Sequence, residues 1–370
     1  MFNFLSLEPE TFGLDINDTS LKVVKLRKKR GFLRPVSFNE KNIPLGVIKD
    51  GIIKDEKALI KIIGELLSSV KGEKINTKYV VASLPEEKSF SQVIQMPKMA
   101  KEELKSAVPF EAENYIPLPA DQVYLDFKEI NPVTNHLDHL DVLVVAVEKV
   151  IADSYVLVLK KSGLIPVALE VETQAIARVL IKDETSLEPV VIVDFGGDSA
   201  DFIVFSGYSV RFTSSIPVSS QQITNKISKD LGISLKEAEH MKKKYGISSI
   251  KTKSNHRTKA VKKSLTPILE ELVKEIQKYL DFYSSQDFHE HFPDKPNKGG
   301  KIEKIILSGG GVNLKGIDEF LQKKLGVAVG FGDPWINFSE SAKNSTLLDL
   351  QKESLSFTTA FGLAMRSMEK

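Results

Sequence analysis

Two segments of the chain share one pattern of apolar and polar positions. Phe12 to Leu26 reads FGLDINDTSLKVVKL, and Val191 to Phe205 reads VIVDFGGDSADFIVF. In each, an apolar run ends at an aspartate, a short polar turn follows, and a second apolar run begins, which predicts a β-hairpin. Three polar positions align between the two: Asp15 with Asp194, Asn17 with Gly196, and Ser20 with Ser199. Because the hairpin starts each half of the chain, we expect a duplicated fold.

A third pattern lies nearer the end of the sequence, where Ile302 to Leu314 reads IEKIILSGGGVNL. Ile305 to Leu307 predicts a strand that runs into Gly309, Gly310 and Gly311, and a helix is expected from Lys315 to Leu325. Glycines lack a side chain and let a flat ligand approach the backbone. The loop has neither the Lys and Ser/Thr of a Walker loop nor the Rossmann spacing, so alone it is a weak signal.

The two hairpin turns carry the residue types that hold a polyphosphate. Turns of this kind present backbone N–H groups and hydroxyls to phosphate oxygens. The turn residues are Asn17, Thr19 and Ser20 in the first hairpin, and Gly196, Gly197 and Ser199 in the second. Asp15 and Asp194 could hold Mg²⁺ through water, and Lys22 could add positive charge. Either hairpin alone reads as an ordinary turn, but their duplication favours a phosphate site gripped from both sides.

The amino-acid composition excludes some classes of function but does not identify one. The chain has 370 residues, 42% hydrophobic and 27% charged, which indicates a globular protein of two or three domains. A net charge of +2 argues against a nucleic-acid partner. The absence of cysteine excludes disulfides, thiolate metal sites and a cysteine nucleophile. No run approaches the roughly 20 apolar residues of a membrane span, and no signal peptide is predicted at the start.

These motifs resemble the phosphate and adenosine motifs of the actin, sugar kinase and heat-shock chaperone superfamily. Within it the chain most resembles the PilM family, cytoplasmic actin-like proteins of type IV pilus assembly. Besides the hairpins, the matching segments are KMAKEELKSAVPFEAENYIPLPADQVYLDF, ALEVETQAIARVL, KEAEHMKKKYG, ELVKEIQKYLDFYSSQ, ILSGGGVNLKGIDEFLQKKLG and TTAFGLAMR. The run EAENYIP is the part most specific to PilM.

The resemblance implies an α/β fold, an actin-like ATPase with two ribonuclease H-like cores and an inserted subdomain of the FtsA and PilM type. It divides the chain into a first core (1–76 and 163–190), an inserted subdomain (77–162), a second core (190–228 and 300–370) and a helical cap (229–299). Asn17 departs from the glycine usual in the family, although asparagine tolerates left-handed backbone. Pro109 should kink or split the helix expected from Lys101 to Tyr115.

The same resemblance implies ATP and Mg²⁺ as cofactors and adds site residues. Glu239 and Lys242 match positions that face the ribose and base. Glu172 or Gln174 matches the region from which actin-like hydrolases orient the attacking water. Nothing in the residues requires fast hydrolysis, so we expect nucleotide binding with at most slow turnover.

For function, the resemblance implies a scaffold that recruits the cytoplasmic tail of a PilN-like inner-membrane protein in a nucleotide-dependent way, alongside other pilus assembly proteins. The scaffold would be cytoplasmic and attached to the inner membrane only through partners. Homo-oligomer formation stays open. Two alternatives are an FtsA-like division filament, disfavoured because no amphipathic helix follows AFGLAMRSMEK, and a sugar-kinase-like phosphotransferase, which lacks a convincing catalytic Asp.

Three further features have mainly structural interpretations. Lys242 to Leu269 holds nine Lys and Arg and no acidic residue, which predicts a solvated loop or, alternatively, a docking patch for an acidic partner or anionic lipid. Ser284 to Lys301 predicts a flexible connector. The histidine pairs His136 with His139 and His289 with His291 lack a third ligand and predict no metal site.

Overall fold

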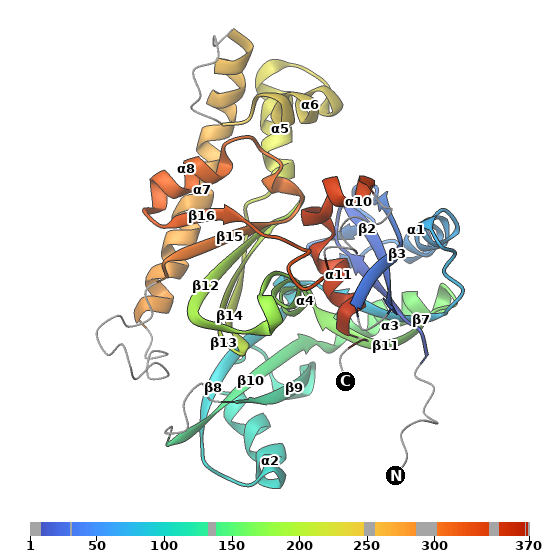
Figure 1. The fold of residues 1–370 in the computed structure, drawn as a ribbon, viewed down its shortest axis with the longest axis vertical. Coiled ribbons are helices and arrows are strands. Elements are labelled where there is room, and N and C mark those ends of the chain that lie inside the picture. Colours follow the sequence, from blue (N-terminus) through green and yellow to red (C-terminus); the bar gives the residue numbers. More distant parts are fainter. Residues whose placement is uncertain are drawn as a thin grey trace.

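Two large β-sheets, with helices between and around them, form most of the described part of the chain (Figure 1). The computed structural model describes residues 9–29, 32–131, 138–247, 256–285, 302–339, 348–366 and 368. His136, His289, His291 and the stretches 248–255 and 286–301 lie outside the described residues. Within the described part of the chain, no helix is both long enough and apolar enough to cross a bilayer.

The first sheet has the strand order β11-β7-β1-β2-β3-β6. Its strands are β1 (Phe12–Ile16), β2 (Ser20–Lys29), β3 (Phe32–Asn42), β6 (Lys71–Gly72), β7 (Tyr79–Leu84) and β11 (Ile165–Val171). β1, β2 and β3 run antiparallel, and β7 and β11 continue in parallel from β1. Apolar side chains of α1 (Glu56–Ser68) and α3 (Lys149–Lys161) share one core with this sheet. A small hairpin of β4 (Ile48–Lys49) and β5 (Ile52–Ile53) lies beside it.

The second half repeats this arrangement. Its strands are β12 (Ser186–Phe195), β13 (Ala200–Gly207), β14 (Ser209–Ile216), β15 (Lys304–Ser308) and β16 (Ala328–Phe331). β12 to β14 are antiparallel, and β15 and β16 extend in parallel from β12. The strand directions of the first sheet therefore recur, which confirms the predicted duplication. The helices on this half are α5 (Ser220–Leu231), α6 (Leu235–Tyr245), α7 (His256–Ser285) and α8 (Ile317–Leu325).

The segment predicted as a loop from Lys242 to Leu269 is largely helical, which corrects that prediction. α6 continues to Tyr245, and α7 begins at His256. Val261, Leu265 and Leu269 are fully buried in the core of the second half. Their spacing of four places them on one helix face. Lysines between these positions hide the apolar period in the sequence, and burial of that face stabilises the helix.

A three-stranded sheet with one helix forms the lower lobe in Figure 1. It consists of β8 (Ser89–Pro97), β9 (Val123–Ile130), β10 (His139–Glu148) and α2 (Lys101–Ala112). β8 meets β14 at one pair, Gln92 with Phe212, so the lobe continues the second sheet to eight strands. A buried ion pair, with Arg211 Nη1 2.5 Å from Asp141 Oδ2, reinforces this junction.

The lobe is shorter than the predicted inserted subdomain of 77–162. β7 and α3, at the two ends of that range, belong to the first half, because β7 pairs with β1 and α3 is buried against the first sheet. Pro109 does not split the helix, since α2 runs through it to Ala112. Proline at this position removes the hydrogen bond to the carbonyl of Lys105, an exposed residue whose carbonyl water can satisfy.

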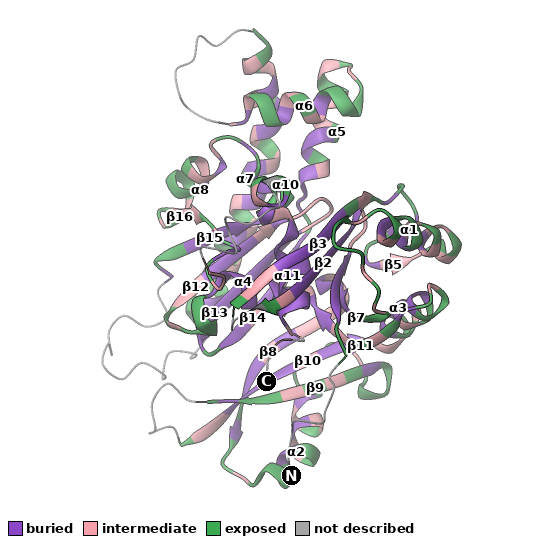
Figure 2. Cartoon of the chain, turned by 45° about the vertical axis from the view of Figure 1, so that its right-hand side comes forward, coloured by how far each residue is buried: buried purple, intermediate pink, exposed green. Residues whose placement is uncertain are grey.

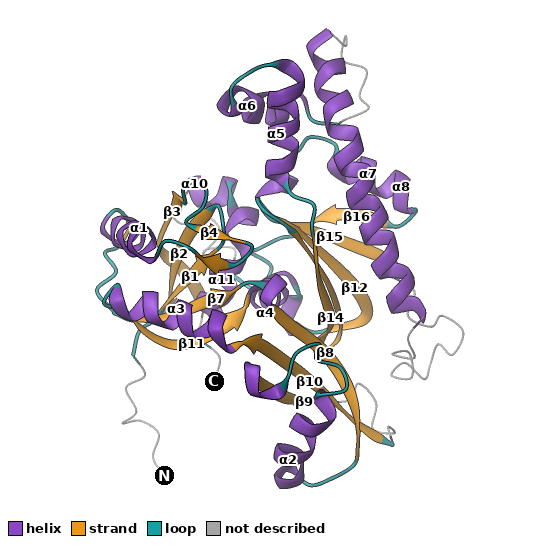
Figure 3. Cartoon of the chain, turned by 180° about the vertical axis from the view of Figure 1, so that it is seen from behind, coloured by secondary structure: helices purple, strands orange, loops and turns teal. Residues whose placement is uncertain are grey.

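Two helices join the halves. α4 (Glu172–Leu180) and α11 (Thr358–Arg366) lie between the sheets and are largely buried (Figures 2 and 3). Their apolar side chains share one core with β2 and β3 of the first sheet and β12 and β13 of the second. A Cβ added to Gly362 would collide with the carbonyl of Ala175, and one added to Gly13 would collide with that of Ala360. The joint is therefore a close backbone contact. The short helix α10 (Leu348–Lys352) precedes α11 in the chain.

Candidate functional site

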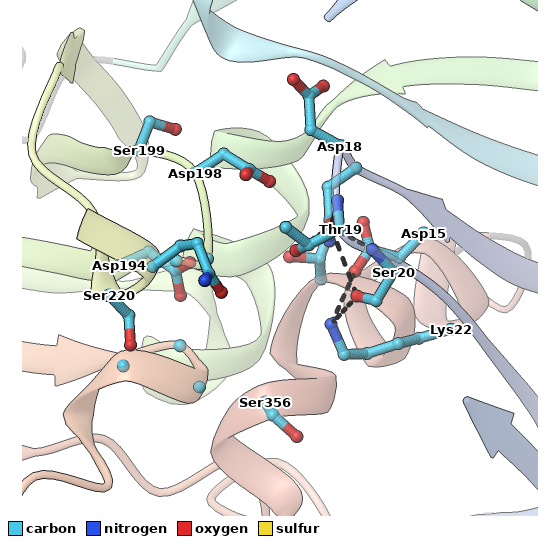
Figure 4. A pocket seen from close by; sticks show the side chains of 18 of the residues that line it. Asp15, Asp18, Thr19, Ser20, Lys22, Asp194, Asp198, Ser199, Ser220 and Ser356 are labelled. Atoms are coloured by element: carbon cyan, nitrogen blue, oxygen red, sulfur yellow. Dashed lines mark hydrogen bonds and ion pairs between the residues drawn. The ribbon is translucent and has the colours of Figure 1, made fainter. Parts of the chain in front are cut away.

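A cavity of about 300 Å³ lies where the two hairpin turns and the glycine loop meet (Figure 4). Every predicted site residue except Gln174 lines it. These residues are Asp15, Asn17, Thr19, Ser20, Lys22, Glu172, Asp194, Gly196, Gly197, Ser199, Glu239, Lys242, Gly309, Gly310 and Gly311. The duplicated motifs therefore converge on one cleft between the halves.

The first turn is organised by its own asparagine. Asn17 Oδ1 accepts hydrogen bonds from the backbone N–H of Thr19 at 3.1 Å and of Ser20 at 2.9 Å. Such a side-chain turn explains how Asn17 substitutes for the expected glycine. Lys22 Nζ donates to Ser20 Oγ at 2.8 Å and lies 3.9 Å from Asp15 Oδ2. The turn thus presents hydroxyl groups and the Lys22 ammonium. The backbone N–H groups of Thr19 and Ser20 are already hydrogen-bonded to the Asn17 side chain.

The second turn faces the first across the cleft. Gly196 N–H donates to the carbonyl of Ser199 at 2.9 Å, which closes the turn. Figure 4 shows Asp198 pointing towards Thr19 of the first turn. Burial raises the pKa of Asp198 to about 6, and a hydrogen bond from Thr19 offsets part of that rise. The two halves therefore touch at their turns.

The glycine loop closes a third side of the cleft. Gly309 has a φ of +88°, a conformation that favours glycine, and begins a 3₁₀ turn at Gly310–Val312. A Cβ at Gly309 would also lie 3.0 Å from Asp194 Oδ2. The hydroxyl of Ser308, the residue before it, donates to the Thr358 hydroxyl at 3.0 Å. Burial raises the pKa of Asp194, and a hydrogen bond from Ser308 offsets part of that rise. The loop sequence is thus required by the close approach of the backbone to the second hairpin.

Carboxylates dominate the electrostatics of the cleft. Burial raises the pKa of Asp15, and it raises the pKa of Asp194 to about 6, with the charge of Asp15 adding to the second shift. Burial likewise raises the pKa of Glu172 and of Asp201 well above the usual range. Asp201 Oδ1 is buried with no hydrogen-bond partner among the described residues. These groups destabilise one another when ionised, so the cleft is suited to a compensating cation.

This arrangement fits Mg²⁺ held through water. In the described ranges no three acidic or histidine side chains are grouped closely enough to ligate a metal directly. Mg²⁺ retains much of its hydration shell and needs few direct protein ligands. Asp15 and Asp194, which stand at the ends of β1 and β12, are the residues that would hold its water shell.

Glu239 and Lys242 lie together at the edge of the cleft on α6. Lys242 Nζ is 2.6 Å from Glu239 Oε2 and donates to Ser220 Oγ at 2.7 Å and to Thr224 Oγ1 at 2.9 Å. Lys242 is buried and connects α6 to α5. Glu239 is the more exposed of the two residues, and it lines the cavity.

Glu172 and Gln174 are separated by the first turn of α4. Glu172 lines the cleft, where its Oε1 accepts the backbone N–H of Glu86 at 3.1 Å. Gln174 lines a different cavity on the other side of the helix. Residues two apart on a helix point about 200° from each other. The spacing of two residues on a helix is therefore enough to predict, from the sequence alone, that these two side chains do not share one site.

Several lining residues were not predicted. The polar ones include Asp18, Glu40, Glu87, Asp198, Asp201 and Ser220. Asp18, Asp198 and Asp201 fall inside the hairpin motifs, so their position was a usable signal. Glu87 reaches the cleft from the segment after β7, and no local pattern marks it.

Two duplicated cores with a shared, turn-lined cleft define an actin-like fold. The chain belongs to the family of the type IV pilus assembly protein PilM, which matches residues 13–368. Among solved structures, the PilM-PilN type IV pilus biogenesis complex is similar with a TM-score of 0.79 and 26% identity, over 98% of this chain and 99% of that chain. MreB5 of Spiroplasma citri bound to AMPPNP shares the fold, with a TM-score of 0.53 and 15% identity over 95% of this chain and 94% of that chain.

Curated relatives match over a shorter stretch. The cell division protein FtsA of Neisseria meningitidis serogroup B is 30% identical over 168 residues, 42% of this chain and 39% of FtsA. FtsA of Buchnera aphidicola (Baizongia pistaciae) is 28% identical over 196 residues, 50% of this chain and 45% of FtsA. The chain spans less than half the length of the curated relatives it matches.

Proposed function

We propose that the chain is a nucleotide-held scaffold of type IV pilus assembly, which binds ATP and Mg²⁺ in the cleft between its halves. The observation that carries this proposal is the convergence of both hairpin turns and the glycine loop on one cavity. A ligand that contacts both halves stabilises the arrangement in which they are close. The protein would act in the cytoplasm, at the inner face of the membrane, through its partners.

The residues divide the work of holding a nucleotide. Thr19, Ser20, Lys22 and the second turn would contact the phosphates, and the Gly309 loop would approach the adenosine. Mg²⁺ would neutralise phosphate charge, with Asp15 and Asp194 orienting its waters. Glu172 is the candidate for orienting an attacking water. Burial raises the pKa of the Glu172 carboxyl well above its usual range.

A second cavity, of about 960 Å³, suits the cytoplasmic tail of a PilN-like inner-membrane protein. It is lined by β9 and β10 of the lower lobe, by α3 and β11 of the first half, and by α4. We call it the lobe groove. The similar complex of PilM with PilN supports a partner of this class. The lobe groove lies where the first core meets the lobe, as the proposed recruitment requires.

The nucleotide would act on the partner through the population of the closed state. If the tail binds the closed state better than the open one, ATP increases its affinity without touching it. Pull-down of the chain by an immobilised PilN-like tail, with and without ATP and Mg²⁺, tests this. We expect more chain retained with ATP. Equal retention, or none in either condition, would contradict the nucleotide-dependent scaffold.

The nucleotide site is tested separately by calorimetry. The variant Asp194→Asn should weaken ATP binding at least tenfold in the presence of Mg²⁺ and have a much smaller effect with EDTA, because the carboxylate acts through the ion. Asp121→Asn, an exposed change in the lower lobe, is the matched control. Unchanged affinity of Asp194→Asn with Mg²⁺ would remove this residue from the metal site.

A further inference from the structure

Three helices of the second half meet at its outer end, which is the upper end of the molecule in Figure 1. They are the last turn of α5, the start of α6 and the first turns of α7. Ser264 Oγ of α7 donates to Asp230 Oδ2 of α5 at 2.7 Å, and Val261 is fully buried beneath this junction. We call residues 226–237 and 256–263 the cap end.

The cap end is strongly basic. It contains seven Lys or Arg residues and two acidic residues. The whole chain has 51 basic and 49 acidic residues, so the remainder of the chain is slightly acidic. Five of the cations at the cap end are exposed to solvent: Lys229, Lys236, Arg257, Lys259 and Lys263. The positive charge of this protein is therefore concentrated on one surface.

The two acidic side chains of the cap end are used within their own helices. Asp230 Oδ1 accepts a hydrogen bond from Lys226 Nζ at 2.6 Å on the same helix. Glu237 Oε2 accepts from the backbone N–H of Ser234 at 3.0 Å and from its hydroxyl at 2.7 Å, which caps α6. Neither carboxylate is placed to neutralise the five exposed cations.

Helix stability does not explain the cations of α7. This helix has no acidic residue in its first turn, where the helix macrodipole favours negative charge. Arg257, Lys259 and Lys263 add positive charge at that end instead. Lys259 and Lys263 are four residues apart, so they lie on one helix face, and like charges at this spacing destabilise a helix. An anionic surface placed against this face would remove the repulsion.

The composition of the cap end favours a lipid surface over a folded protein as its partner. Protein interfaces are enriched in aromatic residues and Arg and are depleted of Lys. The cap end has six Lys, one Arg and no Phe, Tyr or Trp. Clusters of Lys on helices are attracted to anionic headgroups without a shaped pocket. Leu235, which is 46% exposed beside Lys236, adds an apolar side chain that can enter the headgroup region.

We propose that the cap end binds the anionic phospholipid headgroups of a bilayer directly. This inference goes beyond the proposed function, which attaches the chain to the membrane only through partners. The cap end and the lower lobe stand at opposite ends of the longest axis of the molecule (Figure 1). A chain held by headgroups at the cap end and by a membrane-anchored tail in the lobe groove would lie along the membrane rather than stand upright on it.

The test is co-sedimentation of the full chain with vesicles of phosphatidylcholine that contain about one third phosphatidylglycerol, whose headgroup is anionic. We expect the chain to sediment with these vesicles and not with vesicles of phosphatidylcholine alone. Raising the salt from about 0.1 M to about 1 M NaCl should abolish the binding, because the Debye length falls from about 10 Å to about 3 Å.

The cap-end variant replaces Lys229, Lys259 and Lys263 with Gln. A single Lys near an anionic membrane contributes about fivefold to the affinity, so the three replacements should weaken vesicle binding on the order of a hundredfold. The variant should fold normally, because all three side chains are exposed and two of them oppose the macrodipole of α7. Circular dichroism and an unchanged affinity for ATP check this.

The matched control replaces Lys98, Lys101 and Lys105 with Gln. These lysines are exposed in the lower lobe, and their loss changes the net charge by the same amount. Vesicle binding by the control should change by less than about twofold, because these charges lie far from the cap end. If the control and the cap-end variant lose binding equally, net charge alone governs the interaction and the inference is wrong.

The remaining outcomes separate this inference from its rivals and from the proposed function. No binding to the anionic vesicles, or equal binding by the cap-end variant, would overturn it. Poly-L-glutamate that binds the chain when the vesicles do not would assign the cap end to an acidic protein instead. Failure of the unaltered chain to bind ATP or the tail would remove the proposed function and leave the vesicle result intact.

Discussion

At the scale of single residues, Asp198 is an acidic group of the second turn, which is proposed to contact the phosphates. It lies on the second turn against Thr19 of the first, and its pKa is raised to about 6. It is therefore ionised at pH 8 and largely protonated near pH 5. Replacement with asparagine removes the charge and keeps a similar shape.

Asp198→Asn should tighten ATP binding about threefold to tenfold at pH 8, because one charge near the phosphates is removed. The gain should shrink as the pH falls below 6, where the unaltered side chain is already neutral. Calorimetric titrations at pH 8 and pH 5.5 measure both affinities. Weaker binding by Asp198→Asn at pH 8 would show instead that this carboxylate helps to hold the metal.

Most residues of the candidate site could be predicted because they fall inside three local motifs. Local spacing contains two further signals: Gln174 is two residues from Glu172 on one helix, and Asp198 stands within a hairpin motif. Other features could not be predicted. Burial is the main cause of the raised pKa of Asp201. The charges of Glu172 and Glu86, which come from different segments and meet only in the folded chain, raise it further.

At the scale of elements, the joint between α4 and α11 depends on the absence of side chains. Gly362→Ala should destabilise the protein by about 2 kcal/mol or more, because the new methyl group would meet the backbone of Ala175. Urea denaturation measures the loss. Gly64→Ala on α1 is the control, since a Cβ there meets nothing within 4 Å and alanine favours a helix. If the Gly362→Ala variant is as stable as the unaltered chain, α4 and α11 can move apart to accommodate the methyl group, and the prediction is wrong.

The elements themselves were predictable to different degrees. Both hairpins and the strand before the glycine loop follow from apolar runs that end at polar turns. The boundaries of the lower lobe do not follow, because the place of β7 depends on parallel pairing with β1, far away in the sequence. The start of α7 was obscured because its lysines surround a narrow apolar stripe.

At the scale of the whole molecule, the cleft and the lobe groove share α4 as a wall. Glu172 faces one and Gln174 the other. If ATP increases the affinity for the tail by some factor, the tail must increase the affinity for ATP by the same factor. We expect a factor of about five or more. Titrating ATP with and without saturating tail peptide, and the converse, measures both. Tail binding that leaves ATP affinity unchanged while ATP enhances tail binding would mean that the two titrations do not report on one equilibrium.

The close contact of Gly13 with α11 also has a consequence for synthesis. β1 emerges from the ribosome long before residues 358–366. The first half therefore lacks one side of its packing, and its apolar surface stays uncovered, until α11 has been synthesised. Such long-range contacts form slowly and expose aggregation-prone surface. Chains interrupted before α11 should consequently be targets for chaperones and proteases, even when the sequence of the first sheet is complete.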